Sequence, residues 1–188
     1  MRSKDGSKIE SIYNATLQLV KDRGLAGITM SDISKAASIA TGTLYIYFKN
    51  KDELIKALFT TCRQHSAEQY FAGLHESNAF EEKLERLFTN IIYYKMEHFE
   101  VSVFLEQAYH SPFGCATDLK KKQKMLNPLY ALIGEGIAAG KIKAVAPELV
   151  VVFLFGIVNE MVKHTYYAGQ KLTPDAVSQL YTLFRSGI

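Results

Sequence analysis

The sequence predicts an all-α protein of about nine helices in 188 residues. Apolar side chains recur three and four positions apart along almost the whole chain, which is the spacing of a helix with one buried face. Glycines and prolines stand at the ends of these stretches, where they stop or start helices. The sequence shows no stretch with the strict alternation of apolar and polar residues that is typical of a strand.

The first 50 residues predict three helices. An apolar face at residues 8–23 ends at Gly24. A short helix then begins at Thr29, because its hydroxyl can cap the helix while Asp32 reaches back to complete a capping box. This helix is expected to end near Ala37, followed by a turn. Residues 41–48 then form about two further helical turns.

A long helix is expected at residues 51–74. Asn50 and Glu53 predict a second capping box at its start, which puts Lys51 in the first turn. A lysine in this position opposes the helix dipole, whose positive end lies at the N-terminus. A phosphate bound between Lys51 and the exposed N–H groups would remove that conflict.

The rest of the chain predicts five more helices, at residues 80–92, 101–111, 118–139, 147–167 and from 174 onward. Pro112 disfavours helical geometry in the residue before it, and Gly140 is a typical residue just after a helix end. Pro128 lies inside the third of these helices, so it must kink that helix or mark a restart. Pro147 and Pro174 suit the first turns of the last two.

The two short helices and the turn between them have the layout of a helix-turn-helix DNA reader. In the second helix, Leu44 and Phe48 share a face that can pack inward. The opposite side carries hydroxyl groups that can contact phosphates and bases, on Thr41, Thr43, Tyr45 and Tyr47. Gly42 lets the backbone approach DNA without a Cβ. Taken alone, the same pattern also fits an ordinary amphipathic core helix with exposed tyrosines.

The net positive charge lies in the same part of the chain. Residues 1–56 hold nine lysines and arginines against six aspartates and glutamates, whereas residues 57–188 hold thirteen of each sign. The whole net charge of +3 therefore lies in the segment expected to bind DNA. A positively charged segment favours DNA binding because the phosphates attract it. The excess is modest, and many solvated surfaces carry as much.

Residues 24–54, and above all 42–54, resemble the N-terminal DNA-binding domain of the tetracycline-repressor (TetR) family of bacterial transcriptional regulators. The resemblance implies a DNA-binding domain at residues 1–50 and a helical ligand-binding and dimerisation domain at 51–188. It implies that Tyr47 and Lys51 contact phosphates, that Thr29 anchors the DNA backbone, and that the bases face Thr41, Gly42, Thr43 and Tyr45. Ala40 stands where many members carry a serine or threonine cap, so that contact is expected to be missing.

The helix after Pro147 predicts contact with a second copy of the chain. Residues 149–158 are apolar around the whole circumference, so at least two sides must be buried. The resemblance implies that this helix and the last one pair with their copies around a twofold axis, through Val151, Phe155, Val158, Val162, Val177, Leu180, Tyr181 and Phe184. Such a homodimer could read a pseudo-palindromic operator in double-stranded DNA. The alternative is a fully internal helix in a monomer.

Aromatic and methionine side chains are frequent between the DNA-binding segment and the last two helices, and they suit an adaptable apolar cavity. The resemblance implies a small-molecule pocket there, with Phe59, Cys62, Phe88, Tyr93, Phe104, His110 and Met125 as its expected lining. Each of these residues equally fits ordinary core packing. The mechanism expected from the resemblance is repression that ends when a ligand shifts the helix at 51–74 and releases the operator.

Other classes of function have less support. The sequence lacks the HExxH spacing of zinc proteases and the nucleophile elbow of hydrolases, so neither an enzyme nor a cofactor is expected. Cys62 and His65 share a helix face, which leaves a metal- or redox-responsive regulator as an alternative, although Cys62 equally fits a small buried hydrophobe. A ligand-independent architectural DNA binder is another alternative.

The sequence also predicts a cytoplasmic protein without a membrane span. Cys62 and Cys115 lie far apart and outside any partner motif, which fits a reducing compartment. The basic N-terminus is not followed by the apolar segment of a secretory signal. The longest apolar run, residues 149–158, is far shorter than the roughly 20 residues that cross a bilayer.

Overall fold

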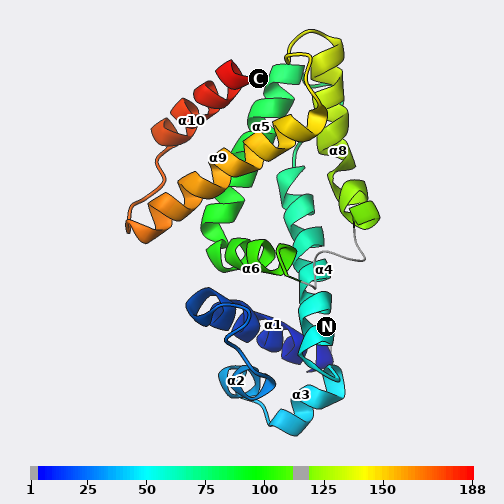
Figure 1. Cartoon of the computed structure of the whole chain (residues 1–188), viewed down its shortest axis with the longest axis vertical. Coiled ribbons are helices and arrows are strands. Elements are labelled where there is room, and N and C mark those ends of the chain that lie inside the picture. The colour runs from blue at the N-terminus through cyan, green and yellow to red at the C-terminus, as the bar shows by residue number, and fades with distance from the viewer. Residues whose placement is uncertain (1–3, 112–118) are drawn as a thin grey trace. The chain divides into compact units, whose positions relative to one another are not determined.

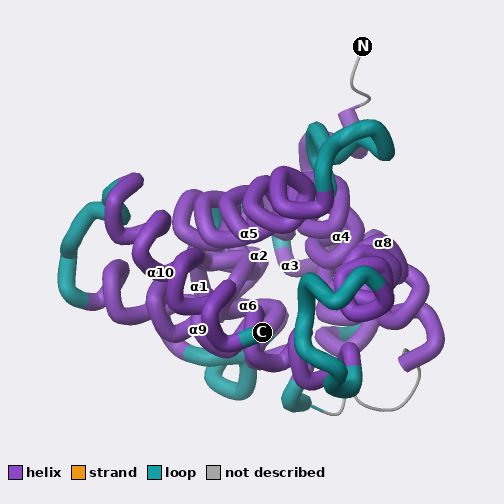
Figure 2. Tube along the Cα trace, turned by 90° about the horizontal axis from the view of Figure 1, so that it is seen from above, coloured by secondary structure: helices purple, strands orange, loops and turns teal. Residues whose placement is uncertain are grey.

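The computed structural model describes residues 4–111 and 119–188, with side chains described for 6–111 and 125–188. This part of the chain contains nine helices and no strand, as the sequence predicts (Figure 2). The helices are α1 (Lys4–Arg23), α2 (Met30–Ala36), α3 (Thr41–Tyr47), α4 (Lys51–Tyr70), α5 (Phe80–Glu97), α6 (Phe99–Tyr109), α8 (Leu119–Ala138), α9 (Pro147–Tyr167) and α10 (Pro174–Gly187) (Figure 1). The expected helix stop at Pro112 lies outside the described residues.

The helices form two compact units. Unit 1 comprises Met1–Gln64 and Glu100–Leu119, and unit 2 comprises His65–Phe99 and Lys120–Ile188. The division therefore differs from the boundary expected after residue 50. Unit 1 includes the first part of α4 and nearly all of α6 because side chains from both helices complete its core.

The core of unit 1 draws on α1, α2, α3, α4 and α6. Its completely buried side chains are Ile12, Val20, Ile33, Leu44, Leu54, Ile55 and Leu58, and α6 adds Val101, Phe104 and Ala108. Residues 8–56 are the part that the sequence identifies as a DNA reader, but they do not enclose this core by themselves. Because burial of apolar area drives folding, α6 is an integral part of the same folding unit.

Unit 2 is built around α5. Phe88 of α5 lies 5.5 Å from the Phe184 ring of α10 and 5.3 Å from that of Tyr181, between ring centroids. α9 packs against both α5 and α10. α8 is anchored through the ammonium of Lys83, which lies 2.8 Å from the Glu135 carboxylate.

Most helix ends follow the sequence signals. Gly24, Gly140 and Gly169 follow the ends of α1, α8 and α9 with φ of 76°, 68° and 64°, the left-handed region that glycine adopts without strain. α4 ends at Tyr70, earlier than expected. Pro128 lies inside α8, which continues across it as one helix, so of the two alternatives the restart does not occur.

One described helix, α9, has the length and apolar composition of a membrane span, and a third of its apolar window is buried within the protein. A core helix of a soluble protein has the same properties, so this feature is weak evidence for a membrane. Its buried residues, which include Val150, Leu154 and Val158, fall on one face at helical spacing. α9 therefore has a core side and an exposed side.

Candidate DNA-binding site

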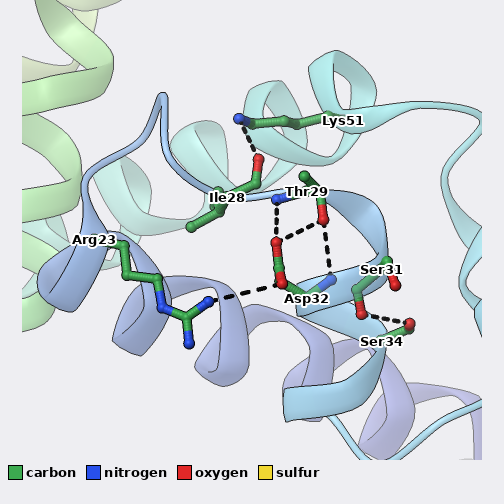
Figure 3. A network of polar contacts seen from close by, with 7 residues as sticks. All are labelled: Arg23, Ile28, Thr29, Ser31, Asp32, Ser34 and Lys51. Atoms are coloured by element: carbon green, nitrogen blue, oxygen red, sulfur yellow. Dashed lines mark hydrogen bonds and ion pairs between the residues drawn. The ribbon is translucent and has the colours of Figure 1, made fainter.

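α2 begins in the capping box that the sequence predicts (Figure 3). The N–H and the hydroxyl of Thr29 both donate to Asp32 Oδ2, at 2.9 and 2.6 Å, and the Asp32 N–H donates to the Thr29 hydroxyl oxygen at 3.2 Å. Hydrogen bonds from the hydroxyl and from the backbone N–H lower the pKa of Asp32. The hydroxyl of Thr29, the residue expected to anchor the DNA backbone, is thus hydrogen-bonded within the cap.

The turn of the helix-turn-helix is a Schellman motif. Ser38 has a φ of 55°, and its N–H donates to Lys35 O at 3.1 Å. The Ile39 N–H donates to Ser34 O at 3.0 Å. These are the two hydrogen bonds that close a helix through a left-handed residue, and they satisfy carbonyls at the end of α2. Ile39 packs against the unit 1 core, which fixes the direction of the chain into α3.

A hydrogen bond between hydroxyls joins α2 to α3. Ser34 is buried, and its hydroxyl donates to Ser31 O at 3.0 Å (Figure 3). Thr41 Oγ1 lies 2.8 Å from Ser34 Oγ. Because Ser34 has a single hydroxyl hydrogen, Thr41 is the donor in this second bond. The Thr41 hydroxyl therefore sets the position of α3 against α2.

α3 has one buried face and one exposed face. Leu44 is buried, and Phe48, just after the helix, is buried beside the Tyr13 ring at 6.0 Å between centroids. On the other side, Tyr45 is 49% exposed and Ile46 is 80% exposed. The other residues expected to contact DNA are exposed at Thr41 and Gly42 and half-buried at Thr43 and Tyr47.

Ile46 is a further candidate contact residue, outside the set predicted from the sequence. It is the most exposed large hydrophobic side chain among the described residues. Its position was available from the sequence, because it stands midway between the inward-facing Leu44 and Phe48 and so points to the opposite side of the helix. An exposed isoleucine beside a tyrosine can contact thymine methyl groups in a major groove.

The fold does not require glycine at position 42. A Cβ built on Gly42 meets no atom within 4 Å, and its φ is not positive. The N-cap before it, Ala40, makes no side-chain cap, as expected from the sequence. Glycine in a helix costs stability relative to alanine, so a requirement from outside the protomer, such as close approach to DNA, explains Gly42 best.

The start of α4 is capped through Asn50, whose Oδ1 accepts the Glu53 N–H at 2.8 Å. The Glu53 carboxylate accepts from the Lys49 N–H at 2.9 Å, one residue before the position expected for a capping box. Lys51 Nζ donates to Ile28 O at 2.7 Å (Figure 3). It also donates to Leu25 O at 2.7 Å. Partial burial lowers the pKa of Lys51. The Lys51 ammonium, which was expected to contact a phosphate, is thus hydrogen-bonded to two backbone carbonyls.

The seven residues expected to line one ligand pocket divide between the two units. Phe59, Cys62 and Phe104 are buried in the core of unit 1, where they pack against apolar neighbours from the DNA-binding segment. These three are core residues of unit 1, and their contact with a ligand stays a prediction. Phe88 lies in the aromatic core of unit 2, Tyr93 and His110 are exposed, and Met125 is half-buried.

The residues expected at a dimer interface are mostly turned inward. Five of them are buried within unit 2 of the single chain, and their contact with a second copy stays a prediction: Val151, Val158, Val162, Val177 and Phe184. Phe155, Leu180 and Tyr181 are half-buried. The large hydrophobic side chains that α9 and α10 leave exposed are others, namely Leu149, Val152, Phe153, Tyr166, Tyr167 and Leu183. Periodicity could not separate the two sides, because residues 149–158 are apolar all round.

The alternative of a metal- or redox-responsive site loses support from Cys62. Burial raises the pKa of its thiol to about 12, which keeps the reactive thiolate scarce at neutral pH. The His65 ring is exposed, with Nδ1 3.9 Å from the Glu68 carboxylate. Cys115 lies outside the described residues. Within residues 4–111 and 119–188, no three His, Cys, Asp or Glu side chains are placed to hold a metal.

Comparisons with known proteins agree with this geometry. The family model of bacterial regulatory proteins of the tetR family matches residues 12–58. The HTH-type transcriptional regulator YhgD of Bacillus subtilis is 30% identical over 140 residues, which cover 73% of each chain.

Solved structures share this fold over nearly their full length. A TetR family transcription regulator from Marinobacter aquaeolei has a TM-score of 0.89 at 23% identity, covering 99% of this chain and 97% of that one. The transcriptional regulator FadR from Bacillus subtilis, solved in complex with stearoyl-CoA, has a TM-score of 0.73 at 25% identity and covers 95% and 98%. The exposed reading helix, the capped helix-turn-helix and these relatives lead to one conclusion: the chain belongs to the TetR family of DNA-binding transcriptional regulators.

Proposed function

We propose that the protein is a cytoplasmic, homodimeric repressor that binds a pseudo-palindromic operator and leaves it when a small-molecule effector binds. The observation that carries this proposal is the outer face of α3, where Gly42, Tyr45 and Ile46 are exposed although the fold needs none of them there. The DNA bases are assigned to these three residues and Thr43, and a phosphate contact is assigned to Tyr47. The hydroxyls of Thr29 and Thr41 act inside the protein.

The exposed side of α9 and α10 supports a homodimer. Leu149, Val152 and Phe153 lie on one face of α9 at helical spacing, and Leu183 adds an exposed leucine from α10. α10 approaches α9 closely at this point, since a Cβ on Gly187 would lie 2.7 Å from the Phe153 ring. Exposed apolar patches of this kind mark protein interfaces. A twofold dimer would set two α3 helices about 34–36 Å apart, the spacing of successive major grooves.

The effector site is assigned to unit 2, where polar groups are buried among aromatic rings. Lys95 is 7% exposed, and its Nζ lies 5.7 Å from the centroid of the Phe155 ring. The Tyr70 ring lies between those of Phe155 and Tyr94, at 6.2 and 5.6 Å, and Ser66 Oγ lies 3.4 Å from the Tyr94 hydroxyl. Burial raises the pKa of Tyr70, so its phenol remains a donor at neutral pH.

This buried cluster favours an effector with an anionic group and an apolar body. The Lys95 ammonium is buried beside an aromatic ring, and an ion pair between it and an anionic group would be strong where water is excluded. The relative FadR binds stearoyl-CoA, an acyl chain with an anionic head. We therefore assign the effector to the fatty-acyl class. It releases DNA only to the extent that it binds the DNA-incompetent conformation more tightly.

The test is a selection of duplexes from a random pool, followed by fluorescence anisotropy on the enriched sequence. Enrichment of a pseudo-palindrome is expected, followed by its release on addition of stearoyl-CoA but not of free coenzyme A. A pool that yields no preferred sequence would contradict the repressor. If the protein binds a preferred sequence with an affinity that stearoyl-CoA does not change, the acyl effector is contradicted. That result would favour a ligand-independent DNA binder.

A further inference from the structure

The segment between α1 and α2, residues 24–29, is held by side chains from two other helices of unit 1. This segment makes the chain reversal that places α2. Gly24 has a φ of 76°, and a Cβ on Gly27 would lie 2.6 Å from Arg23 O, so both positions need glycine. Two apolar side chains, Leu25 and Ile28, are buried in the core. Their peptide groups lie outside any helix and need partners from elsewhere.

Three side-chain hydrogen bonds supply those partners. Gln107 Oε1, from α6, accepts the Leu25 N–H at 2.7 Å. Lys51 Nζ, from α4, donates to Leu25 O and Ile28 O at 2.7 Å each. The residue Leu25 is thus held at its amide by one helix and at its carbonyl by another. We call Lys51, Gln107 and the segment they hold the loop clamp.

The loop clamp is connected to the reading helix by a short chain of contacts. The segment ends at Thr29, which is the N-cap of α2. α2 in turn is bonded to α3 through Ser34 and Thr41. A displacement of the segment therefore moves the start of α2 and, with it, the exposed face of α3.

We propose that Lys51 and Gln107 are positioning residues for DNA binding, and that Lys51 acts through the loop clamp instead of through a phosphate. The inference rests on the proposed role of α3 as the reading helix. Lys51 carries three N–H donors, and two of them are directed at carbonyls inside the protein. These bonds also offset the unfavourable position of a cation at a helix N-terminus. Gln107 makes α6 part of the DNA-binding apparatus although it lies far outside the helix-turn-helix in sequence.

Salt dependence separates positioning from phosphate contact. Removing one phosphate contact lowers the slope of log K against log salt by about 0.9, whereas misplacing α3 weakens binding with little change of slope. We expect Lys51→Met and Gln107→Leu each to reduce affinity for the selected duplex on the order of tenfold at an unchanged slope. The double variant is expected to lose little more than the worse single variant, because both changes release one segment.

A second measurement needs no DNA. Amide exchange of Leu25 and of the first turn of α2 is expected to accelerate in Lys51→Met and in Gln107→Leu. Gln107→Glu is the matched control, because it keeps the acceptor oxygen and so keeps the Leu25 amide protected. A phosphate contact cannot alter exchange in the free protein.

The proposal is overturned if Lys51→Met lowers the salt slope while exchange stays as in the wild type, or if Gln107→Leu changes neither affinity nor exchange. Failure to select any duplex would count against the repressor itself. The exchange measurements on the free protein would still decide whether the loop clamp exists.

Discussion

The Thr41 hydroxyl at the start of α3 lies 2.8 Å from the hydroxyl oxygen of the buried Ser34 in α2. This contact joins the two helices of the helix-turn-helix directly, beyond the turn that connects them in sequence. Because Ser34 is buried, a change there cannot remove a contact with DNA. A loss of DNA affinity in a folded Ser34 variant therefore indicates that the orientation of α3 has changed.

Ser34→Ala is expected to destabilise the protein by about 1–2 kcal/mol, since it removes two hydrogen bonds at a buried position. DNA affinity is expected to fall at the same time, while the salt dependence stays as in the wild type. Urea denaturation and anisotropy on the selected duplex measure the two effects. Ser186→Ala, at an exposed hydroxyl bonded only to Leu183 O in its own helix, is the matched control and should change neither. Unchanged stability in Ser34→Ala would show that the contact is unimportant.

Gly42→Ala is expected to separate stability from function. Alanine stabilises a helix over glycine by up to about 1 kcal/mol, and the Cβ at this position meets open space in the protomer. The same Cβ would hold the α3 backbone away from DNA, so affinity should fall although the protein melts higher. Gly134→Ala in α8 is a matched control, because a Cβ there also meets nothing within 4 Å. Normal DNA binding by Gly42→Ala would exclude close backbone approach at this residue.

The helix-turn-helix could be predicted from the sequence in detail because its signals are local. Thr29 and Asp32 cap α2 as expected, and Leu44 is buried as the spacing predicts. The roles of Lys51 and Gln107 could not be predicted in the same way. Both depend on a contact with the segment at residues 24–29 from a different part of the chain, which no local pattern encodes.

The sequence also could not predict which of the remaining apolar residues are buried in which core. A run such as residues 149–158 has no polar face, so its register against the core depends on which neighbours fill the space around α9. Phe59 and Phe104 fit a pocket or a core equally well by composition. Their place in the core of unit 1 follows from α6 packing there, a tertiary contact between distant segments.

The cap of α2 predicts a pH dependence of stability. The folded-state pKa of Asp32 is lowered, first by the Thr29 hydroxyl and then by its N–H, so the ionised form is favoured in the native state. The stabilisation is present above the unfolded pKa of about 4 and is lost as the pH falls through the lower folded value. The urea midpoint should therefore drop between pH 5 and pH 3, and drop less in Asp32→Asn. Thr29→Val should also make the urea midpoint depend less on pH. If the midpoint of either variant falls with pH in parallel with the wild type, the assignment of this pH dependence to Asp32 is contradicted.

Val152→Glu is expected to dissociate the proposed dimer without unfolding the protomer. Val152 is 69% exposed, so glutamate is accommodated in the isolated chain, but in a dimer it would bury a charge at an apolar interface. Light scattering after size exclusion should change from twice the chain mass of 21.1 kDa to that mass. Val145→Glu, exposed just before α9, is the control that should stay dimeric. A Val152→Glu protein that remains dimeric would place the interface elsewhere.

Lys95→Met is expected to change which ligands unit 2 accepts. Methionine keeps the length and apolar contacts of the buried lysine stem but removes the ammonium beside Phe155. The wild type should be stabilised against heat more by decanoate than by decan-1-ol, because only the acid brings a negative charge to the buried ammonium. In Lys95→Met the preference should vanish, while DNA affinity without ligand stays normal because the DNA-reading face belongs to unit 1. Equal stabilisation of the wild type by the acid and the alcohol would show that Lys95 has a structural role and does not select anions.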